Sequence, residues 1–388
     1  MIYQKNIAII IGTRPEAIKL APVIRALKKE GIKTTVCIFR QHGKMLDETL
    51  RELNVKPDIS FSISISDRML GKGSGLIQKG IAGLQSGLGI LRYMKFLKKE
   101  KPDMVIVQGD TLTAFLAAFL AFLAKTPVAH VEAGLRTYDK FAPFPEEINR
   151  QLIARLADIH FAPTESAKQN LLREGISENH IYVVGNTAID ALFQVAGTEE
   201  VVPPSGGPTS ERLEVEPRKK IILVTAHRRE SFGEGLKEIC SALKEIAEKR
   251  SDVKIVLPVH PNPNVEKVVR EELEGIKNIE LCAPLPYTKM VEAMRASYLI
   301  LTDSGGIQEE APSLGKPVLV MREKTERQEG VDAGVSKLVG VKKEAIVVGV
   351  RELLENKEVY ERMSRAQNPY GDGKASERIT EKVKVFMI

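Results

Sequence analysis

Cysteine is scarce in this chain of 388 residues. Only three cysteines occur, Cys37, Cys240 and Cys282, and they lie far apart in the sequence. No CxxC pair or Cys/His cluster has the spacing of metal ligands. The pattern excludes a disulfide scaffold, and we expect all three residues to be core thiols.

Long apolar runs are also missing. The longest, Leu112–Ala124, contains Thr113 and falls short of the roughly 18 uncharged residues that a membrane span needs, so we expect a buried helix. The N-terminal stretch Met1–Gly12 lacks a small-residue cleavage site and is not typical of a signal peptide. We therefore expect a cytoplasmic protein.

No block of basic residues occurs, although positive charge slightly dominates. Lys and Arg total 57 against 51 Asp and Glu, which gives a net charge of +6. The basic residues are interspersed with acidic ones, and no aromatic RNA-binding motif is present. A positive balance suits an anionic ligand, and this pattern favours nucleotides or sugar phosphates over nucleic acid.

The chain does contain a regular alternation of short β-branched runs and helix-length amphipathic stretches, which is typical of parallel α/β sheets. The expected strands are Ile7–Ile11, Thr34–Phe39, Met104–Gln108, Val128–Glu132, Ile159–Ala162, Ile221–Thr225, Lys254–Pro258, Tyr298–Thr302 and Pro317–Met321. The Pro/Gly-rich stretch Thr198–Pro217 interrupts this alternation and predicts the connection between two domains.

The two halves of the chain resemble each other. Met104–Gly134 and Tyr298–Arg327 each predict a strand, a polar turn with an Asp, a helix and a second strand. This weak repeat predicts two Rossmann-like domains facing across a cleft, with ligand at the carboxyl ends of the strands. We expect one domain to comprise residues 1–190 plus 370–388, with the last helix crossing back onto it, and the other residues 191–369. That helix places four apolar residues on one face: Ala375, Ile379, Val383 and Phe386.

Polar residues follow the first predicted strand. Thr13 and Glu16 have capping-box spacing and Pro15 suits a first helical turn, so helix capping alone explains these three residues. Capping does not explain Arg14, and Lys19 lies one turn into the helix among apolar neighbours. We expect Arg14 and Lys19 to face an anion, with a solvated lysine as the alternative.

Three acidic candidates lie further along the first half. Asp110 follows a predicted strand and would either cap the next helix or serve a site. Glu132 ends an apolar run, where a buried acid needs partners, and this favours a site role. Glu146 opens a predicted helix, and its alternative role is a surface ion pair with Arg150, four residues later.

In the second half, His227 ends a predicted strand together with Arg228 and Arg229. An imidazole beside two guanidinium groups could clamp a pyrophosphate. His260 lies in a rigid proline-rich turn, where a structural role is favoured.

The stretch Thr302–Glu310 is the most specific pattern. Ser304 could cap a helix while the amides of Gly305 and Gly306 approach a phosphate. Glu310 could accept both ribose hydroxyls, as the acidic residue of dinucleotide sites does. A plain tight turn is the alternative for the two glycines.

Together these motifs resemble those of the non-hydrolysing UDP-N-acetylglucosamine 2-epimerases, in the same order and over essentially the full length. The matching motifs are Gly12–Glu16, Gly109–Thr111, His130–Thr137, Pro145–Arg150, His227–Glu230 and Thr302–Glu310. The resemblance implies a glycosyltransferase-B-like fold, a homodimer, and reversible conversion of UDP-N-acetylglucosamine to UDP-N-acetylmannosamine for polysaccharide biosynthesis. It also implies elimination of UDP to a glycal and re-addition, without a metal or nicotinamide cofactor.

The resemblance also implies roles for single residues. The catalytic and sugar-side set would be Asp110, Glu132, Glu146, Lys19 and Arg150, with His227 on the diphosphate. The other UDP contacts would be Arg14, Met290, Ser304, Gly305, Gly306 and Glu310. A second, activating UDP-N-acetylglucosamine site would use Gln41, Arg68, Arg228 and His260.

The sequence departs from the family pattern at a few positions. Gly43 and Lys44 stand where an Arg and a Gln are common, which argues against activation at the second site. Gln328 replaces a usual Pro, and Met290 stands where an aromatic residue often lines the uracil. We expect neither of these last two changes to abolish function.

Three other functions fit part of the pattern. A hydrolysing relative would release UDP and free N-acetylmannosamine, but its bifunctional members usually carry a kinase domain, which is not predicted here. A glycosyltransferase would explain the fold and Glu310 but would not require Asp110, Glu132 and Glu146 together. A non-catalytic nucleotide-sugar sensor would bind UDP without turnover.

Overall fold

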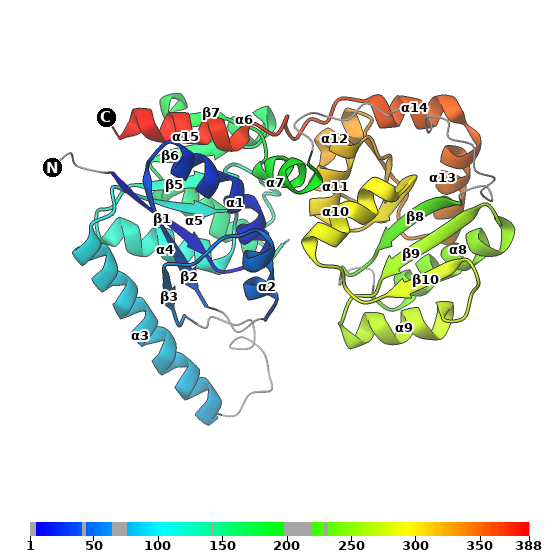
Figure 1. The fold of residues 1–388 in the computed structure, drawn as a ribbon, viewed down its shortest axis with the longest axis horizontal. Coiled ribbons are helices and arrows are strands. Elements are labelled where there is room, and N and C mark those ends of the chain that lie inside the picture. Colours follow the sequence, from blue (N-terminus) through cyan, green and yellow to red (C-terminus); the bar gives the residue numbers. More distant parts are fainter. Residues whose placement is uncertain are drawn as a thin grey trace. The chain divides into compact units, whose positions relative to one another are not determined.

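The computed structural model describes residues 5–40, 44–63, 76–141, 143–197, 219–228 and 232–387. The chain divides into two compact units (Figure 1), unit 1 with Met1–Ala191 and Gly373–Ile388, and unit 2 with Leu192–Asp372. The sequence placed these boundaries at 190 and 369. The predicted connection at 198–217 lies outside the described residues.

Unit 1 contains a seven-stranded parallel sheet in the order β3-β2-β1-β4-β5-β6-β7. Its strands are β1 Asn6–Ile11, β2 Lys33–Phe39, β3 Ile59–Phe61, β4 Met104–Gln108, β5 Val128–Val131, β6 Ile159–Ala162 and β7 Ile181–Val183. Its helices are α1 Arg14–Lys29, α2 Lys44–Glu52, α3 Leu76–Glu100, α4 Leu112–Leu123, α5 Glu146–Leu156, α6 Glu165–Arg173, the 3-10 turn η2 Glu178–His180 and α15 Ala375–Phe386. Helix α7, Thr187–Ala196, begins in unit 1 and ends in unit 2.

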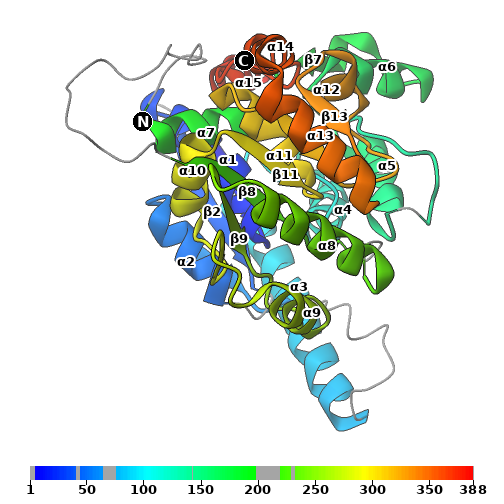
Figure 2. The same ribbon diagram turned by 90° about the vertical axis from the view of Figure 1, so that its right-hand side faces the viewer.

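Unit 2 contains a six-stranded parallel sheet in the order β10-β9-β8-β11-β12-β13. Its strands are β8 Lys220–Thr225, β9 Val253–Pro258, β10 Ile279–Cys282, β11 Leu299–Thr302, β12 Val318–Val320 and β13 Ser336–Leu338. Its helices are α8 Glu234–Lys249, α9 Pro263–Leu273, α10 Tyr287–Ala296, α11 Gly305–Glu310, the 3-10 turn η4 Ala311–Leu314, α12 Gln328–Asp332, α13 Lys343–Glu355 and α14 Lys357–Arg365. Helices α8 and α13 lie side by side (Figure 2).

The two sheets have the same topology. In each, the first strand lies inside the sheet and the chain winds outwards first on one side and then on the other, so β1 next to β4 corresponds to β8 next to β11. This order is that of a Rossmann fold, in which ligands bind beyond the carboxyl ends of the strands where the winding direction changes. The predictions of two Rossmann-like domains and of an internal repeat are confirmed.

Sequence patterns missed only the strands at the sheet edges. All nine expected strands are present, but β3, β7, β10 and β13 were not predicted, and these four form the edges of the two sheets. Each has only three or four residues and includes exposed or half-buried positions. An edge strand buries less side-chain surface, so its sequence carries little of the apolar signal that identifies the central strands.

The apolar run at Leu112–Ala124 forms α4, but it is buried on one face only. Thr113, the alanines and Leu120 face the interior. Phe119, Phe122 and Leu123 are 39%, 55% and 53% exposed. The expectation of a buried helix therefore holds for one face of α4 only. Within the described residues, no helix combines the length and hydrophobicity needed to cross a membrane.

The C-terminal helix α15 packs against α1 in unit 1 (Figure 1). Asp190 anchors its first turn, because the Asp190 carboxylate accepts hydrogen bonds from the backbone N–H of Ser376 at 2.7 Å and of Ala375 at 3.2 Å. Ala375, Ile379 and Val383 are buried as predicted, whereas Phe386 is exposed in the last turn.

The prediction that all three cysteines are core thiols needs one correction, because Cys282 on the edge strand β10 is only half-buried.

Two histidines lie side by side in the sheet of unit 1. His130 on β5 pairs in register with His160 on β6, and both are buried. Burial lowers the pKa of His130 from 6.5 to about 4 and that of His160 from 6.5 to about 3. Both rings are therefore neutral near pH 7.

These two shifts predict acid sensitivity. Because both folded-state pKa values lie below the unfolded value of 6.5, protonation favours the unfolded chain, so stability is fully present above pH 6.5 and falls as the pH drops towards 4. Between pH 6.5 and 5 the free energy of unfolding should fall by up to about 2 kcal/mol per histidine. Urea unfolding at pH 7.5 and pH 5 measures this. His160→Asn should shrink the pH dependence and His180→Asn, at an exposed position, should not; equal slopes in all three proteins would contradict the prediction.

Candidate functional site

Glu16 ties together the loops that follow β1 and β4. Its Oε2 accepts the backbone N–H of Gly12 and of Thr13, each at 2.6 Å, and its Oε1 accepts the hydroxyl of Thr111. The carboxylate half of the predicted capping box is thus present, but Glu16 is also fully buried, and burial raises its pKa. A Cβ at Gly12 would lie 2.4 Å from Thr113 Oγ1, so only glycine fits there. The loops at the point where the winding of this sheet changes direction are therefore locked together.

Glu132 lies directly after β5 and is held by residues from two other elements. Lys19 Nζ from α1 donates to Glu132 Oε2, and Gln108 Nε2 at the end of β4 donates to the same oxygen at 3.1 Å. The predicted need of a buried acid for partners is met. Lys19 was expected to face an anion, and the anion that it contacts here is Glu132.

The backbone of Glu132 is strained. Its φ is +63°, in the left-handed region that costs a non-glycine residue on the order of 1 kcal/mol or more and that is concentrated at functional sites. By contrast, Gly134 and Arg136 of the same motif have structural roles. A Cβ at Gly134 would lie 2.2 Å from the carbonyl oxygen of Ala167. Arg136 forms a bidentate ion pair with Glu174, with Nε 2.7 Å from Oε1 and Nη2 2.8 Å from Oε2.

Asp110 does not cap the helix that follows it. The N-cap of α4 is Thr111, whose hydroxyl accepts the N–H of Ala114 at 3.0 Å. The alternative of Asp110 as an N-cap is therefore wrong. Its carboxylate accepts a hydrogen bond from Arg150, and its backbone carbonyl accepts one from Asn149 Nδ2 at 2.9 Å.

Arg150 does not pair with Glu146 as an i,i+4 surface pair. Arg150 is buried and bonds to Asp110 and, at 3.3 Å, to Glu147 three residues earlier. Glu147 and Arg150 are both buried on α5, whereas Glu146, in the first turn of the helix, is only half-buried.

The adjacent acids Glu146 and Glu147 differ in their environment. Glu147 is completely buried and accepts hydrogen bonds from the backbone N–H of Thr137 at 3.0 Å and of Tyr138 at 3.2 Å, besides Arg150. Glu146 is half-buried and makes no hydrogen bond or ion pair with the described residues. Glu147 therefore supports the loop and Glu146 remains available for chemistry.

In unit 2, Asp303 joins the loops after β8 and β11. Its Oδ2 accepts the backbone N–H of His227 and of Arg228, each at 2.7 Å, and His227 Nδ1 lies 3.0 Å from its Oδ1. Asp303 was not among the predicted site residues, although it is the first residue after β11, where polar side chains of this fold point to ligands. Gln108, the last residue of β4 in unit 1, was missed in the same way, and Glu147, a buried residue of α5, was also missed.

Three arginines of unit 2 lie around Glu326. Arg322 donates to Glu326 at 2.7 Å, Arg327 also donates to it, and Arg228 lies 3.8 Å away. Burial raises the pKa of Glu326, but Arg327 and Arg322 outweigh burial and lower it to about 2.

The His260 ring stacks on His227 with 5.5 Å between ring centres. Arg229, Gln41 and Arg68 lie outside the described residues.

The Thr302–Glu310 motif runs from β11 into α11. Ser304 is the N-cap residue, but its hydroxyl makes no capping hydrogen bond, so the predicted cap is wrong. Gly305 and Gly306 are helical and neither has a positive φ, which excludes the tight-turn alternative. A Cβ at Gly305 would lie 2.8 Å from the guanidinium carbon of Arg327.

Glu310 lies at the end of α11 with little exposure. Tyr287 Oη donates to Glu310 Oε2 at 3.3 Å. Met290 follows Tyr287 by three residues and is half-buried on α10, so the two side chains share a helix face. The geometry brings the expected ribose acceptor close to this helix.

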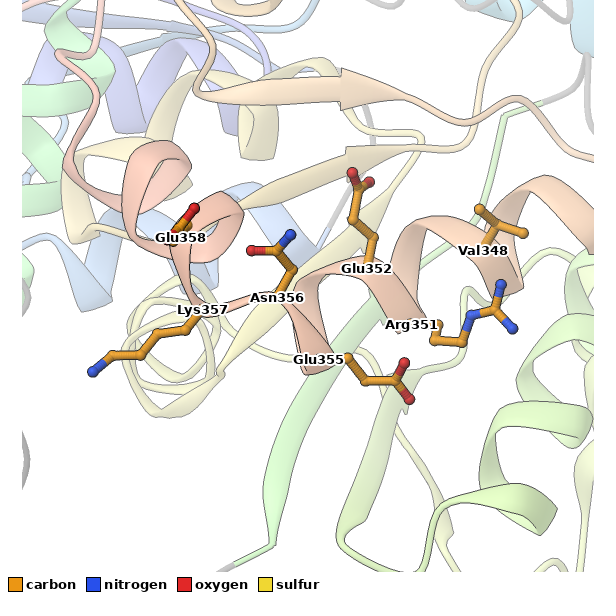
Figure 3. Close-up of a pocket in the computed structure, with 7 residues that line it drawn as sticks. All are labelled: Val348, Arg351, Glu352, Glu355, Asn356, Lys357 and Glu358. Carbon is orange, nitrogen blue, oxygen red and sulfur yellow. The ribbon is translucent and has the colours of Figure 1, made fainter.

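A cavity of about 650 Å³ lies elsewhere, at the junction of α13 and α14 (Figure 3). Its lining is Val348, Arg351, Glu352, Glu355, Asn356, Lys357 and Glu358, and none of these was predicted for a site. Two of its carboxylates are already paired, Glu352 with Lys337 and Glu355 with Arg250. We assign no function to this cavity.

Comparison with known proteins identifies the family to which this chain is similar. Residues 25–384 match the family model described as UDP-N-acetylglucosamine 2-epimerase. A UDP-N-acetylglucosamine 2-epimerase from Yersinia pestis is 49% identical, with 97% of each chain covered. The crystal structure of UDP-GlcNAc 2-epimerase from Neisseria meningitidis bound to UDP-GlcNAc is 42% identical, with a TM-score of 0.83 and coverage of 98% of this chain and 100% of that one. The Methanocaldococcus jannaschii UDP-GlcNAc 2-epimerase in complex with UDP-GlcNAc and UDP is 37% identical, with a TM-score of 0.76 and coverage of 98% and 99%.

The contrast between Glu146 and Glu147 predicts different effects on stability. Glu147→Gln removes a buried charge that faces Arg150 and two backbone donors, and should lower the free energy of unfolding by about 3 kcal/mol. Glu146→Gln removes no interaction with the described residues and should change it by less than about 0.5 kcal/mol. Guanidinium unfolding of both variants tests this, and equal destabilisation would show that the two roles are misassigned.

Proposed function

The chain belongs to the UDP-N-acetylglucosamine 2-epimerase family, and we propose that it interconverts UDP-N-acetylglucosamine and UDP-N-acetylmannosamine in the cytoplasm, for polysaccharide biosynthesis. The observation that carries the proposal is the set of acids following neighbouring strands of unit 1. Asp110 and Glu132 follow β4 and β5, and Glu146 opens the helix that packs beside α4. The free thiols of Cys37, Cys240 and Cys282 support a reducing compartment.

The reaction inverts C2 of the sugar, which carries an unactivated C–H bond. Elimination of UDP to a glycal removes the C2 hydrogen as a proton, and re-addition of UDP after protonation on the other face gives the epimer. Carboxylates that take and return protons at C2 and the C3 hydroxyl are needed for this route. Asp110, Glu132 and Glu146 supply them between them, and Lys19 and Arg150 orient the first two and balance their charge.

The departing diphosphate needs positive charge and hydrogen-bond donors. We assign this task to His227 and Arg14, with Lys19 near the sugar. Nucleotide contacts are assigned to Met290, Ser304, Gly305, Gly306 and Glu310. The hydroxyl of Ser304 is not used by a helix cap, so it can donate to a phosphate oxygen.

We do not extend the proposal to an activating second site. Of its four residues, Gln41 and Arg68 lie outside the described residues. Arg228 faces Glu326 and His260 stacks on His227, so both have contacts within unit 2. Gly43 and Lys44 also depart from the family pattern.

We further propose that the protein is a homodimer through an apolar face of unit 1. Helix α4 contacts both α3 and α5, and each of the three helices exposes large apolar residues. These residues are Leu88, Leu91, Phe119, Phe122, Leu123 and Leu152. Exposed large apolar residues on neighbouring helices are typical of an interaction site, and a second copy of the chain would cover them.

An NMR time course with UDP-N-acetylglucosamine separates the proposed function from each alternative by its product. The proposal predicts UDP-N-acetylmannosamine in equilibrium with substrate. A hydrolysing enzyme would release UDP and free N-acetylmannosamine, a glycosyltransferase would give neither product without an acceptor, and a sensor would leave the substrate unchanged. Any of these three outcomes would refute the proposed function.

Single substitutions test the assignment of the acids. Asp110→Asn, Glu132→Gln and Glu146→Gln keep shape but remove a base, so each should slow turnover by about 100- to 10,000-fold. Glu178→Gln, at an exposed ion pair, is the matched control and should keep full activity. Calorimetry should find UDP affinity retained in these variants but reduced in Glu310→Gln. Near-normal rates in all three acid variants would remove them from the chemistry.

The apolar face predicts the effect of a charge at its centre. Light scattering should give the wild type about twice the chain mass of 42.9 kDa. Phe122→Glu should reduce this to the mass of one chain, because a buried unpaired charge is costly in an apolar interface. Val348→Glu, at an exposed apolar position of unit 2, should leave the dimer intact. A monomeric wild type, or a dimer that Phe122→Glu does not weaken, would contradict the assignment.

A further inference from the structure

We propose that Asp303 is a positioning residue that fixes the tautomer of the His227 ring, holding hydrogen on Nδ1 and leaving Nε2 for the diphosphate. The inference rests on the proposed function for the role of His227, but its structural part stands on the contacts of unit 2 alone.

Asp303 contacts two atoms of His227, the backbone nitrogen and the ring nitrogen Nδ1. Its carboxylate is 0% exposed and lies at the end of β11, next to the end of β8 in the sheet. Oδ2 accepts the backbone N–H of His227 and of Arg228, and Oδ1 lies 3.0 Å from His227 Nδ1. The carboxylate therefore accepts a hydrogen bond from the backbone of His227 and lies within ion-pair distance of the ring of the same histidine.

The charge of Asp303 decides which nitrogen of the ring carries hydrogen. Burial raises the pKa of Asp303, but the hydrogen bonds from His227 and from the backbone N–H groups outweigh burial and hold the pKa below its ordinary value. An ionised carboxylate can only accept hydrogen bonds. Nδ1 of His227 must then be the donor, and the neutral ring carries no hydrogen on Nε2.

A second contact fixes the plane of the ring. The His260 ring stacks on His227 at 5.5 Å with an interplanar angle of 16°. His260 is itself held, because its Nδ1 accepts the backbone N–H of Asn262 at 3.2 Å. With one edge on Asp303 and one face on His260, the His227 ring has its Nε2 edge left over, without a partner among the described residues.

This arrangement lets His227 bind a departing diphosphate as a cation. When Nε2 is protonated, the ring donates from Nε2 to the anion while Nδ1–H stays on Asp303, which stabilises the imidazolium. The negative charge on the diphosphate grows during elimination, so this interaction strengthens in the transition state.

The substitution Asp303→Asn tests the tautomer of His227, because the surrounding donors allow the new amide only one orientation. The amide oxygen must face the two backbone N–H groups, because an NH₂ there would oppose two donors. The amide NH₂ then faces His227 Nδ1, which must become an acceptor, so the neutral ring moves its hydrogen to Nε2. Protonation of this ring would place Nδ1–H against the amide NH₂ and is disfavoured.

The alternative is that Asp303 has only a structural role, a staple that holds the loop after β8 against the loop after β11. A staple would affect folding and substrate binding whether or not His227 is present. A positioning residue acts through His227, so its substitution should matter little once the imidazole is gone. The variants Asp303→Asn, His227→Gln and the double variant therefore form the required cycle.

Nitrogen-15 NMR of the histidine rings reads the tautomer directly, with the His227 signal among the six histidines assigned by its loss in His227→Gln. We expect hydrogen on Nδ1 in the neutral wild-type ring and on Nε2 in Asp303→Asn. The wild-type spectrum decides the tautomer even if Asp303→Asn fails to fold. Hydrogen on Nε2 in the wild type, or an unchanged tautomer in a folded variant, would overturn the proposal whether or not the protein epimerises its substrate.

Kinetics test the second half of the claim. Asp303→Asn should lower kcat at least about 10-fold with a smaller change in KM, since a wrong tautomer in a Ser-His-Asp triad costs roughly 10⁴-fold. In the His227→Gln background the same change should lower kcat by less than about twofold. An equal loss in both backgrounds would show that Asp303 is only a staple. Absence of turnover in the wild type would refute the proposed function and leave the tautomer result standing.

Discussion

A buried carboxylate bridges the point where the winding of each sheet changes direction. Glu16 does this in unit 1, where it binds the backbone after β1 and the side chain of Thr111 after β4. Asp303 does it in unit 2, where it binds the backbone after β8 from its place after β11. An acid in such a position must have donors around it, because an unpaired buried charge would cost several kcal/mol. The loops that follow the strands are therefore held in one conformation, and the side chains that follow them are held with the loops.

The same constraint separates the acids that support the site from those that can react. Glu16 and Glu147 are buried and their oxygens are occupied by backbone and side-chain donors. Asp110 and Glu132 each have a cationic partner, and Glu146 has no partner among the described residues. Glu132 also has a strained backbone, which its contacts with Lys19 and Gln108 maintain. In the proposed reaction, Asp110, Glu132 and Glu146 would transfer protons, and Glu16 and Glu147 would support the loops beside them.

Much of the fold could be predicted from the sequence because central strands bury both faces. Their β-branched runs are continuous, whereas β3, β7, β10 and β13 are short edges without such a signal. Residues of the candidate site could be predicted where a polar side chain ends an apolar run, as with Glu132 and Asp110. The partners of these residues could not be predicted from the sequence. Arg150 bonds to Asp110 and Glu147 and not to Glu146, and this depends on tertiary packing, which sequence spacing does not describe. The exposed face of α4 was missed for a related reason, since composition reports hydrophobicity but not what covers it.

The central claim is that the hydrogen at C2 leaves as a proton and returns from an acid of the protein. Turnover of UDP-N-acetylglucosamine in heavy water, followed by NMR and mass spectrometry of newly formed UDP-N-acetylmannosamine, tests it most directly. The acids of unit 1 exchange their protons with solvent, so the account predicts deuterium at C2 of the product. Product that carries only the original hydrogen at C2 would contradict it, because the hydrogen would then have moved without passing through an exchangeable acid.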